Sequence, residues 1–100
     1  MKLLVLSSRD VRDLLSYAEC GQVLRAALAA RARGEVHQPL RTMVRPDRAA
    51  GLMALMPAYW PGGTAAYGLK AICVIPGNPA RGLDAHQGVV LLSSTQTGEP

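Results

Sequence analysis

The residues AYGLKAICVI, 66–75, are the clearest indication of the fold in this 100-residue chain. It is rich in aliphatic and β-branched residues and lies between the turn-forming sequences PGG (61–63) and PGNPARG (76–82), so it predicts a strand. Similar runs, separated from one another by segments that contain Pro and Gly, occupy residues 40–45, 52–59 and 88–93. Four such runs in succession predict a mixed or antiparallel sheet.

The residues before this sheet have a different pattern. Residues 3–6 predict a short strand, and Ser7 with Asp10 forms a capping-box pattern at the start of a helix. Apolar residues then recur at helical spacing, Gly21 predicts a joint between two helices, and Gly34 predicts the C-terminal end of the second. The order of an N-terminal strand, helices and then strands predicts an α+β fold.

Length and composition limit the chain to a single domain, residues 1–100. With 49% hydrophobic and 18% charged residues, it is not a disordered tail. The net charge of +4 comes from scattered arginines, and one Trp, three Tyr and no Phe leave few rings for bases to stack on, so we expect no nucleic-acid partner. Prolines and glycines divide the uncharged stretch 49–69 into strand-sized pieces, so we expect no membrane span.

The cysteines, histidines and glycines indicate the redox state of the thiols and make a metal site or a phosphate-binding loop unexpected. Cys20 and Cys73 are far apart with apolar neighbours, which predicts two reduced thiols and a cytoplasmic protein. We expect no metal site, because His37 and His86 are distant and Asp84 would add only one ligand to His86. The glycine-rich segment 76–82 lacks the Lys and Ser/Thr of a phosphate loop, and no Gly-x-Gly-x-x-Gly occurs.

Two of the basic residues in strand-like runs are candidates for binding an anion. Strand alternation places Lys70 on the same face as Ile72 and Val74. An ammonium group on such an apolar face is expected to bind an anion or to have a lowered pKa. The alternative is a lysine on an edge strand, whose apolar stem lets the ammonium group reach water. Arg41 begins another run, and its guanidinium group suits a carboxylate to which Lys70 could also bind. The alternative for Arg41 is an ordinary surface arginine.

The last residues suggest an interrupted sheet. Residues 94–99 have the composition of a turn and follow the strongly apolar run 89–92. A turn implies a returning strand, and an apolar edge strand is normally covered. We therefore expect a partial domain that is truncated at its C-terminus.

Six motifs, in order and with compatible spacing, resemble the ornithine cyclodeaminase/mu-crystallin family over essentially the whole chain. They are QPLRT (38–42), LMPAY (55–59), YGLK (67–70), PGNPARGL (76–83), HQGVVLL (86–92) and TGEP (97–100). The resemblance implies an NAD(P)-dependent oxidoreductase or deaminase that acts on the carbon–nitrogen bond of an α-amino or α-imino acid. It also implies that this part of the protein supplies a substrate-binding sheet and the interface of a homodimer, while a Rossmann domain follows.

The resemblance further implies roles for individual residues. Arg41 and Lys70 would hold the carboxylate of a small amino or imino acid, and Lys70 would also be catalytic by moving protons at the amine or imine. Met56 would line the pocket beside the reacting carbon. Ala85 and His86 would lie near the cofactor, NAD or NADP.

Two departures from the family pattern narrow these expectations. Members that cyclise ornithine carry a Glu two residues before the Met-Pro pair, where this chain has Ala54, so alanine-dehydrogenase-like or ketimine-reductase-like chemistry is favoured. The chain also lacks the family's Rossmann glycines, so we expect that these residues alone bind no cofactor and are inactive. The alternative function is a non-catalytic carboxylate-binding or dimerising interaction module.

Overall fold

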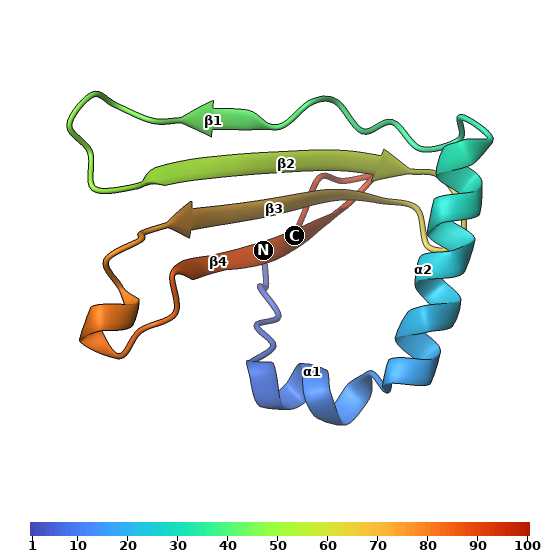
Figure 1. Cartoon of the computed structure of the whole chain (residues 1–100). Coiled ribbons are helices and arrows are strands. Elements are labelled where there is room, and N and C mark those ends of the chain that lie inside the picture. Colours follow the sequence, from blue (N-terminus) through green and yellow to red (C-terminus); the bar gives the residue numbers. More distant parts are fainter.

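The computed structural model describes all 100 residues as two helices followed by one sheet (Figure 1). The helices are α1 (Ser8–Leu14) and α2 (Tyr17–Ala32), and the strands are β1 (Thr42–Val44), β2 (Leu52–Trp60), β3 (Ala66–Val74) and β4 (His86–Ser94). The strands pair in the order β1-β2-β3-β4, and every pair is antiparallel. The predicted α+β class is confirmed, and the sheet is antiparallel rather than mixed.

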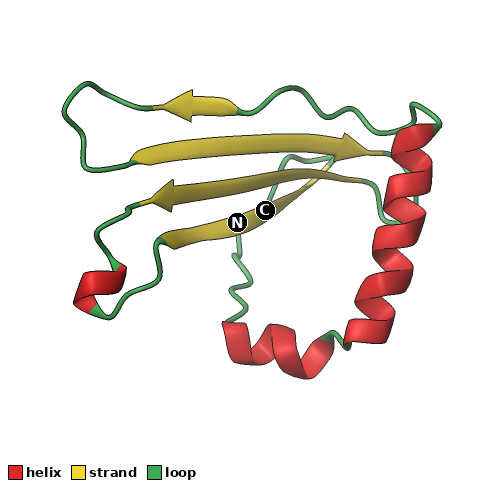
Figure 2. Cartoon of the chain, viewed as in Figure 1, coloured by secondary structure: helices red, strands yellow, loops and turns green.

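The helices stand apart from the sheet. Figure 2 shows α2 across the end of the sheet where β2 ends and β3 begins, with α1 away from the strands. No Cα atom of either helix comes within 8 Å of a Cα atom in a strand. Neither helix therefore covers a face of the sheet closely.

Two N-terminal predictions were wrong. Residues 3–6 form no strand, because neither edge of the sheet pairs with them, and half or more of each side chain is exposed. The joint between the helices lies at Leu15 and Ser16 rather than at Gly21, which is inside α2. Ser16 and Glu19 form a second capping box that starts α2, and this local signal outweighs the low helix propensity of glycine.

Other local predictions are confirmed. Ser7 accepts a hydrogen bond from the amide of Asp10, whose carboxylate accepts one from the amide of Ser7, so the first capping box is complete. Gly34 follows the C-cap residue of α2 with a φ of 76°, a left-handed conformation that favours glycine.

The connection between β3 and β4 is an ordered loop that contains a short 3₁₀ helix, Pro79–Arg81. Its centre is Asn78, one of only three buried residues in the chain, whose side-chain amide donates to the carbonyl oxygen of Asp84 at 3.0 Å. The amide of Ile75 closes the loop by donating to the carbonyl oxygen of Ala85 at 2.8 Å. This loop determines where β4 begins.

The sheet has little core of its own. Besides Asn78, only Ala30 and Ala54 are buried, while Val90 and Leu92 of β4 are 70% and 62% exposed. Apolar area that stays in contact with water contributes nothing to folding. The apolar surface of β4 is therefore available to other molecules or other parts of a protein.

Candidate functional site

Two of the predicted site residues face each other on the central strands. The register places Met56 of β2 directly opposite Lys70 of β3, and Lys70 directly opposite Val90 of β4. Residues that are directly opposite each other in an antiparallel sheet point to the same face, with Cα atoms about 4.5–5.5 Å apart. Met56, Lys70 and Val90 therefore form one row across the sheet.

Arg41 extends this row on the other side of Met56. β1 begins with Thr42 opposite Leu55, so the preceding residue, Arg41, comes opposite Met56 when the ladder is continued by one position. Neighbouring strands lie about 4.8 Å apart, so Arg41 and Lys70 are separated by roughly 10 Å along the row. Two side chains of this length can both reach a small anion that lies over Met56.

Lys70 lies on the same face as Ile72 and Val74, as its alternation predicted. It is not on an edge strand, because β3 has β2 on one side and β4 on the other, and its side chain is exposed. No carboxylate lies within 4.0 Å of Lys70 or Arg41, since the ion pair in this chain joins Arg33 to Glu35 on the surface. This face of the sheet therefore presents two positive charges without an acidic partner.

A shallow hollow of about 190 Å³ lies beside Lys70 on this face. Its lining includes His86, Gly88 and Val90 from β4, so the structure brings the predicted residues Lys70 and His86 to one place. Ala85, half-buried, precedes His86 at the end of the connecting loop. Met56, Lys70 and His86 thus lie along one row or at its hollow, Arg41 immediately precedes the first paired residue of β1, and Ala85 precedes His86.

Gly88 forms part of this hollow and was not predicted as a site residue. A Cβ atom at this position would lie 2.2 Å from the carbonyl oxygen of Ala71 and 2.7 Å from the side chain of Ile72. Only glycine fits there, and its missing side chain leaves the space beside Lys70 open. A glycine within an otherwise apolar strand is the signal that could have indicated such a close approach.

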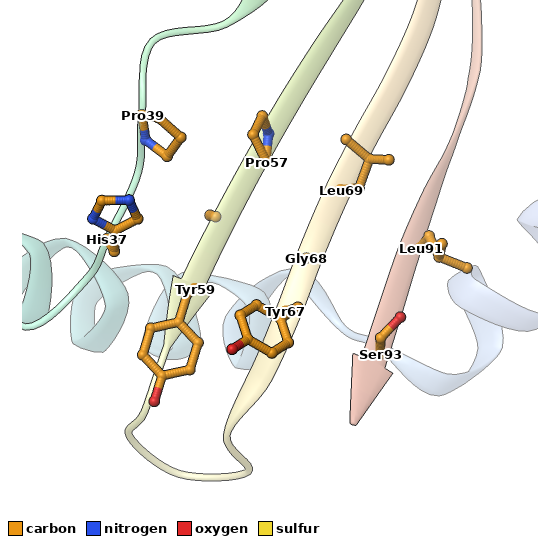
Figure 3. Close-up of a pocket in the computed structure, with 10 residues that line it drawn as sticks. His37, Pro39, Pro57, Tyr59, Tyr67, Gly68, Leu69, Leu91 and Ser93 are labelled. Carbon is orange, nitrogen blue, oxygen red and sulfur yellow. The ribbon is translucent and has the colours of Figure 1, made fainter. Parts of the chain in front are cut away.

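A larger hollow, about 350 Å³, lies on the opposite face of the sheet (Figure 3). Its lining is largely apolar and contains the neighbouring rings of Tyr59 and Tyr67, whose centroids are 5.1 Å apart and whose planes are tilted by 38°. None of the predicted site residues contributes to it. We place the candidate site on the Lys70 face, because the positive charges and the predicted residues are there.

The pKa shifts of this chain arise at other places. Hydrogen bonds from Ser7 and Ser16 lower the pKa of Asp10 and Glu19, respectively, in the two capping boxes. The Arg33 guanidinium group lowers the pKa of Glu35 by a hydrogen bond and by its charge. These shifts belong to helix ends and the surface, so they do not bear on the chemistry of the site.

Three further observations concern metal ions, thiols and membranes. No group of three or more His, Cys, Asp or Glu side chains is arranged to hold a metal ion. Cys20 and Cys73 are both free. Neither helix combines the length and the hydropathy that crossing a bilayer requires.

Comparison with known proteins finds relatives that are named alanine dehydrogenase and pyrroline-2-carboxylate reductase. The sequence is 30% identical to alanine dehydrogenase of Archaeoglobus fulgidus over 100 residues, which is 100% of this chain and 30% of the relative. It is 36% identical to Delta(1)-pyrroline-2-carboxylate reductase 1 of Burkholderia multivorans over 98 residues, 95% of this chain and 29% of the relative. The chain therefore spans less than a third of the length of the curated relatives it matches.

Solved structures agree with the sequence comparison. The Delta(1)-pyrroline-2-carboxylate reductase of Thermococcus litoralis, solved with NADH and L-proline, superposes with a TM-score of 0.90 at 28% identity, covering 98% of this chain and 30% of that one. An archaeal alanine dehydrogenase dimer with bound NAD superposes with a TM-score of 0.88 at 30% identity, covering 100% and 30%. The model of the ornithine cyclodeaminase/mu-crystallin family matches residues 1–100. The resemblance seen in the six motifs is thus confirmed, and this chain belongs to the ornithine cyclodeaminase/mu-crystallin family.

Proposed function

We propose that residues 1–100 are the substrate-binding and dimerisation part of an NAD(P)-dependent oxidoreductase or deaminase that acts on the carbon–nitrogen bond of an α-amino or α-imino acid. The observation that carries this proposal is the row of Arg41, Met56 and Lys70, with two cations that have no acidic partner beside an open hollow. Membership of the family and relatives named alanine dehydrogenase and pyrroline-2-carboxylate reductase support it.

In this proposal Arg41 and Lys70 bind the two sides of the substrate carboxylate. The guanidinium group donates two parallel hydrogen bonds, and the ammonium group adds a third donor and a second charge. Holding the carboxylate fixes the adjacent Cα, with Met56 beneath it, and this orientation lowers the barrier of a reaction at that carbon. Lys70 is also a residue of this face that can exchange a proton with the amine or imine nitrogen.

NAD or NADP, when bound, would supply or accept a hydride at that carbon. These 100 residues contain no Gly-x-Gly-x-x-Gly sequence, the fingerprint of a dinucleotide site between a strand and a helix. We therefore assign no step of hydride transfer to this chain, and we expect that it binds no cofactor and is inactive by itself. Ala85 and His86 remain our proposal for the residues nearest the cofactor.

The next row of residues on the same face of the sheet indicates which substrate side chains the site would accept. Ala54 lies opposite Ile72, and Ile72 lies opposite Gly88, so this row is small and uncharged. A cationic side chain such as that of ornithine would find no carboxylate here and would meet the positive charges of Arg41 and Lys70. We therefore favour alanine-dehydrogenase-like or ketimine-reductase-like chemistry over ornithine cyclisation.

Carboxylate binding by the 100-residue chain tests this proposal. We expect pyruvate to shift the backbone amide signals of residues around Met56 and Lys70 in an NMR titration, and Arg41→Ala to weaken binding about tenfold by removing a charge-assisted hydrogen bond. Arg45→Ala is the matched control, because Arg45 is an exposed arginine beyond the other end of β1 and, when the ladder is continued by one position, lies on the same face but two rows away from Met56. Equal binding by all three proteins would exclude the row as a carboxylate site.

The alternative proposal is a non-catalytic carboxylate-binding or dimerising interaction module. It is supported by the exposed apolar surface of β4, which another chain could cover. Analytical ultracentrifugation of the 100-residue chain, alone and mixed with a full-length relative, discriminates the two. A stable complex formed by a chain that binds no pyruvate in the NMR titration would favour a module that only dimerises. Loss of pyruvate binding in both Arg41→Ala and Lys70→Ala would exclude such a module, and turnover by the full-length enzyme that is lost in the same variants would favour the substrate site over non-catalytic carboxylate binding.

We further propose that the parent enzyme is a homodimer, as the archaeal alanine dehydrogenase of known structure is described. The free state of Cys20 and Cys73 supports a reducing, cytoplasmic compartment.

A further inference from the structure

The chain segment that carries Arg41 pairs with β2 in two registers that do not agree. His37 pairs with Tyr59, and Thr42 pairs with Leu55. Between these two pairs β2 contributes three residues, 56–58, whereas the segment before β1 contributes four, 38–41. The segment therefore contains one extra residue, which is a β-bulge.

Two prolines lie where the pairing fails. The amide of Tyr59 donates to the carbonyl oxygen of His37 at 2.8 Å, and the amide of His37 donates back at 2.9 Å. Residues two positions apart on a strand direct their backbone groups to the same side, so the next such pair in this register is Pro39 opposite Pro57. Figure 3 shows both prolines on these neighbouring segments. Neither has an amide hydrogen, so both hydrogen bonds of this pair are impossible.

The extra residue decides the face on which Arg41 lies. In the register of His37, residue 41 would come opposite Leu55, on the face of Tyr59 and the larger hollow. The bulge moves Thr42 into that place, so Arg41 comes opposite Met56, on the face of Lys70. A shift of one residue reverses the face of every side chain that follows it.

We propose that Pro39 and Pro57 are positioning residues, which maintain this bulge and thereby place Arg41 on the same face as Met56 and Lys70. The part of this proposal that concerns substrate binding rests on the proposed function, whereas the part that concerns the register does not. The segment before His37 is held by α2 and by the bond from the amide of Glu35 to the carbonyl oxygen of Ala30. The loop of residues 45–50 is exposed and can accommodate a shift of β1 by one residue along β2. When the prolines are replaced, we therefore expect β1 to pair with β2 in the register that His37 and Tyr59 set.

The test is the variant Pro39→Val/Pro57→Val of the 100-residue chain, examined by amide hydrogen exchange and by NMR contacts between Hα atoms. In the unaltered chain we expect an Arg41–Met56 contact, because this pair is of the close, non-hydrogen-bonded kind. In the variant we expect protected amides at positions 39 and 57, loss of that contact, a new Leu40–Met56 contact, and about tenfold weaker pyruvate binding. Pro61→Val is the matched control, because Pro61 lies in the turn after β2, outside the ladder.

Three results would overturn the proposal. They are unprotected amides at positions 39 and 57, an Arg41–Met56 contact that persists in the variant, and the same changes in Pro61→Val. If the double variant does not fold, the single variant Pro39→Val tests the same point. Valine at this position has an amide that can donate to the carbonyl oxygen of Pro57, and the position is exposed, so the substitution should not prevent folding. If the unaltered chain binds no pyruvate, the proposed function fails for this chain, while the exchange and contact data still decide the role of the prolines.

Discussion

The side-chain amide of Asn78 donates a 3.0 Å hydrogen bond to the backbone carbonyl oxygen of Asp84, and it does so from one of the few buried positions in the chain. The backbone carbonyl oxygen of Asn78 accepts bonds from the amides of Arg81 and Leu83 at 2.8 and 3.1 Å. One residue thus connects both ends of the loop that leads to Ala85 and His86.

Asn78→Ala should therefore loosen this loop. We expect the free energy of unfolding to fall by about 1–2 kcal/mol, because the carbonyl oxygen of Asp84 loses a buried partner. Amide exchange of residues 79–85 should become faster. Gln87→Ala is the control, because Gln87 also donates to Asp84, at 3.1 Å, but is exposed. Denaturant unfolding of the two variants checks this, and equal losses would contradict the central role of Asn78.

Gly88→Ala should disrupt the pairing of β3 with β4. The new Cβ atom would lie 2.2 Å from the carbonyl oxygen of Ala71, a backbone atom that can move only if the strands separate. We expect a loss of about 1–3 kcal/mol in unfolding free energy, typical of overpacking, and a smaller hollow beside Lys70.

Gly68→Ala is the matched control within the same sheet. Its Cβ atom would meet the side chain of Leu92 at 3.7 Å, an ordinary van der Waals contact. Thermal unfolding should leave Gly68→Ala close to the unaltered chain. Equal destabilisation of the two variants would show that loss of glycine, rather than the close backbone approach, is responsible.

Lys70→Met should weaken pyruvate binding while leaving the stability of the chain nearly unchanged. The substitution retains the apolar stem and removes the charge, so we expect the pyruvate dissociation constant to rise about tenfold. The free energy of unfolding should change by less than about 0.5 kcal/mol, because Lys70 is exposed and has no ion-pair partner.

The chain's other lysine supplies the control for this variant. Lys2→Met removes the same charge from the exposed N-terminal segment and should leave pyruvate binding unchanged. Calorimetry or an NMR titration of both variants measures the difference. Equal weakening would mean that pyruvate responds to net charge rather than to the row on the sheet.

The capping box of α2 should be visible as a pH effect. Hydrogen bonds from Ser16 lower the pKa of Glu19 below its usual value of 4.5, so the carboxylate form is favoured in the folded chain. The stabilisation is fully present above the pKa of the unfolded chain and is lost as the pH falls through the lower, folded value.

Ser16→Ala should raise the pKa of Glu19 toward its usual value, which an NMR titration of the carboxyl carbon measures directly. Helix content, followed by circular dichroism, should then decline at a higher pH than in the unaltered chain. Ser8→Ala is the control, because Ser8 lies in the first turn of α1 and is not its N-cap. A Glu19 pKa that does not change in Ser16→Ala would contradict the capping box.

Local signals predicted much of this fold. The four strands appear near the expected positions, and the end of α2 at Gly34 and the capping box of Ser7 are confirmed, because Pro, Gly and Ser act through a few neighbouring residues. The predicted strand at residues 3–6 was wrong for the opposite reason. A strand requires a hydrogen-bonded partner, and nothing in its own sequence shows whether a sheet edge will pair with it.

From the sequence alone, the two helices and the four strands could be expected in the right order, together with the family and the residue types available for a carboxylate. The three-dimensional structure was needed to show that Met56 faces Lys70, that Gly88 opens the space beside it, and that β1 pairs with β2 in a register one residue away from that of His37. The physical reason is that alternation assigns side chains to two faces within one strand. Which faces of neighbouring strands coincide depends on register, and register is set by hydrogen bonds between residues far apart in the chain.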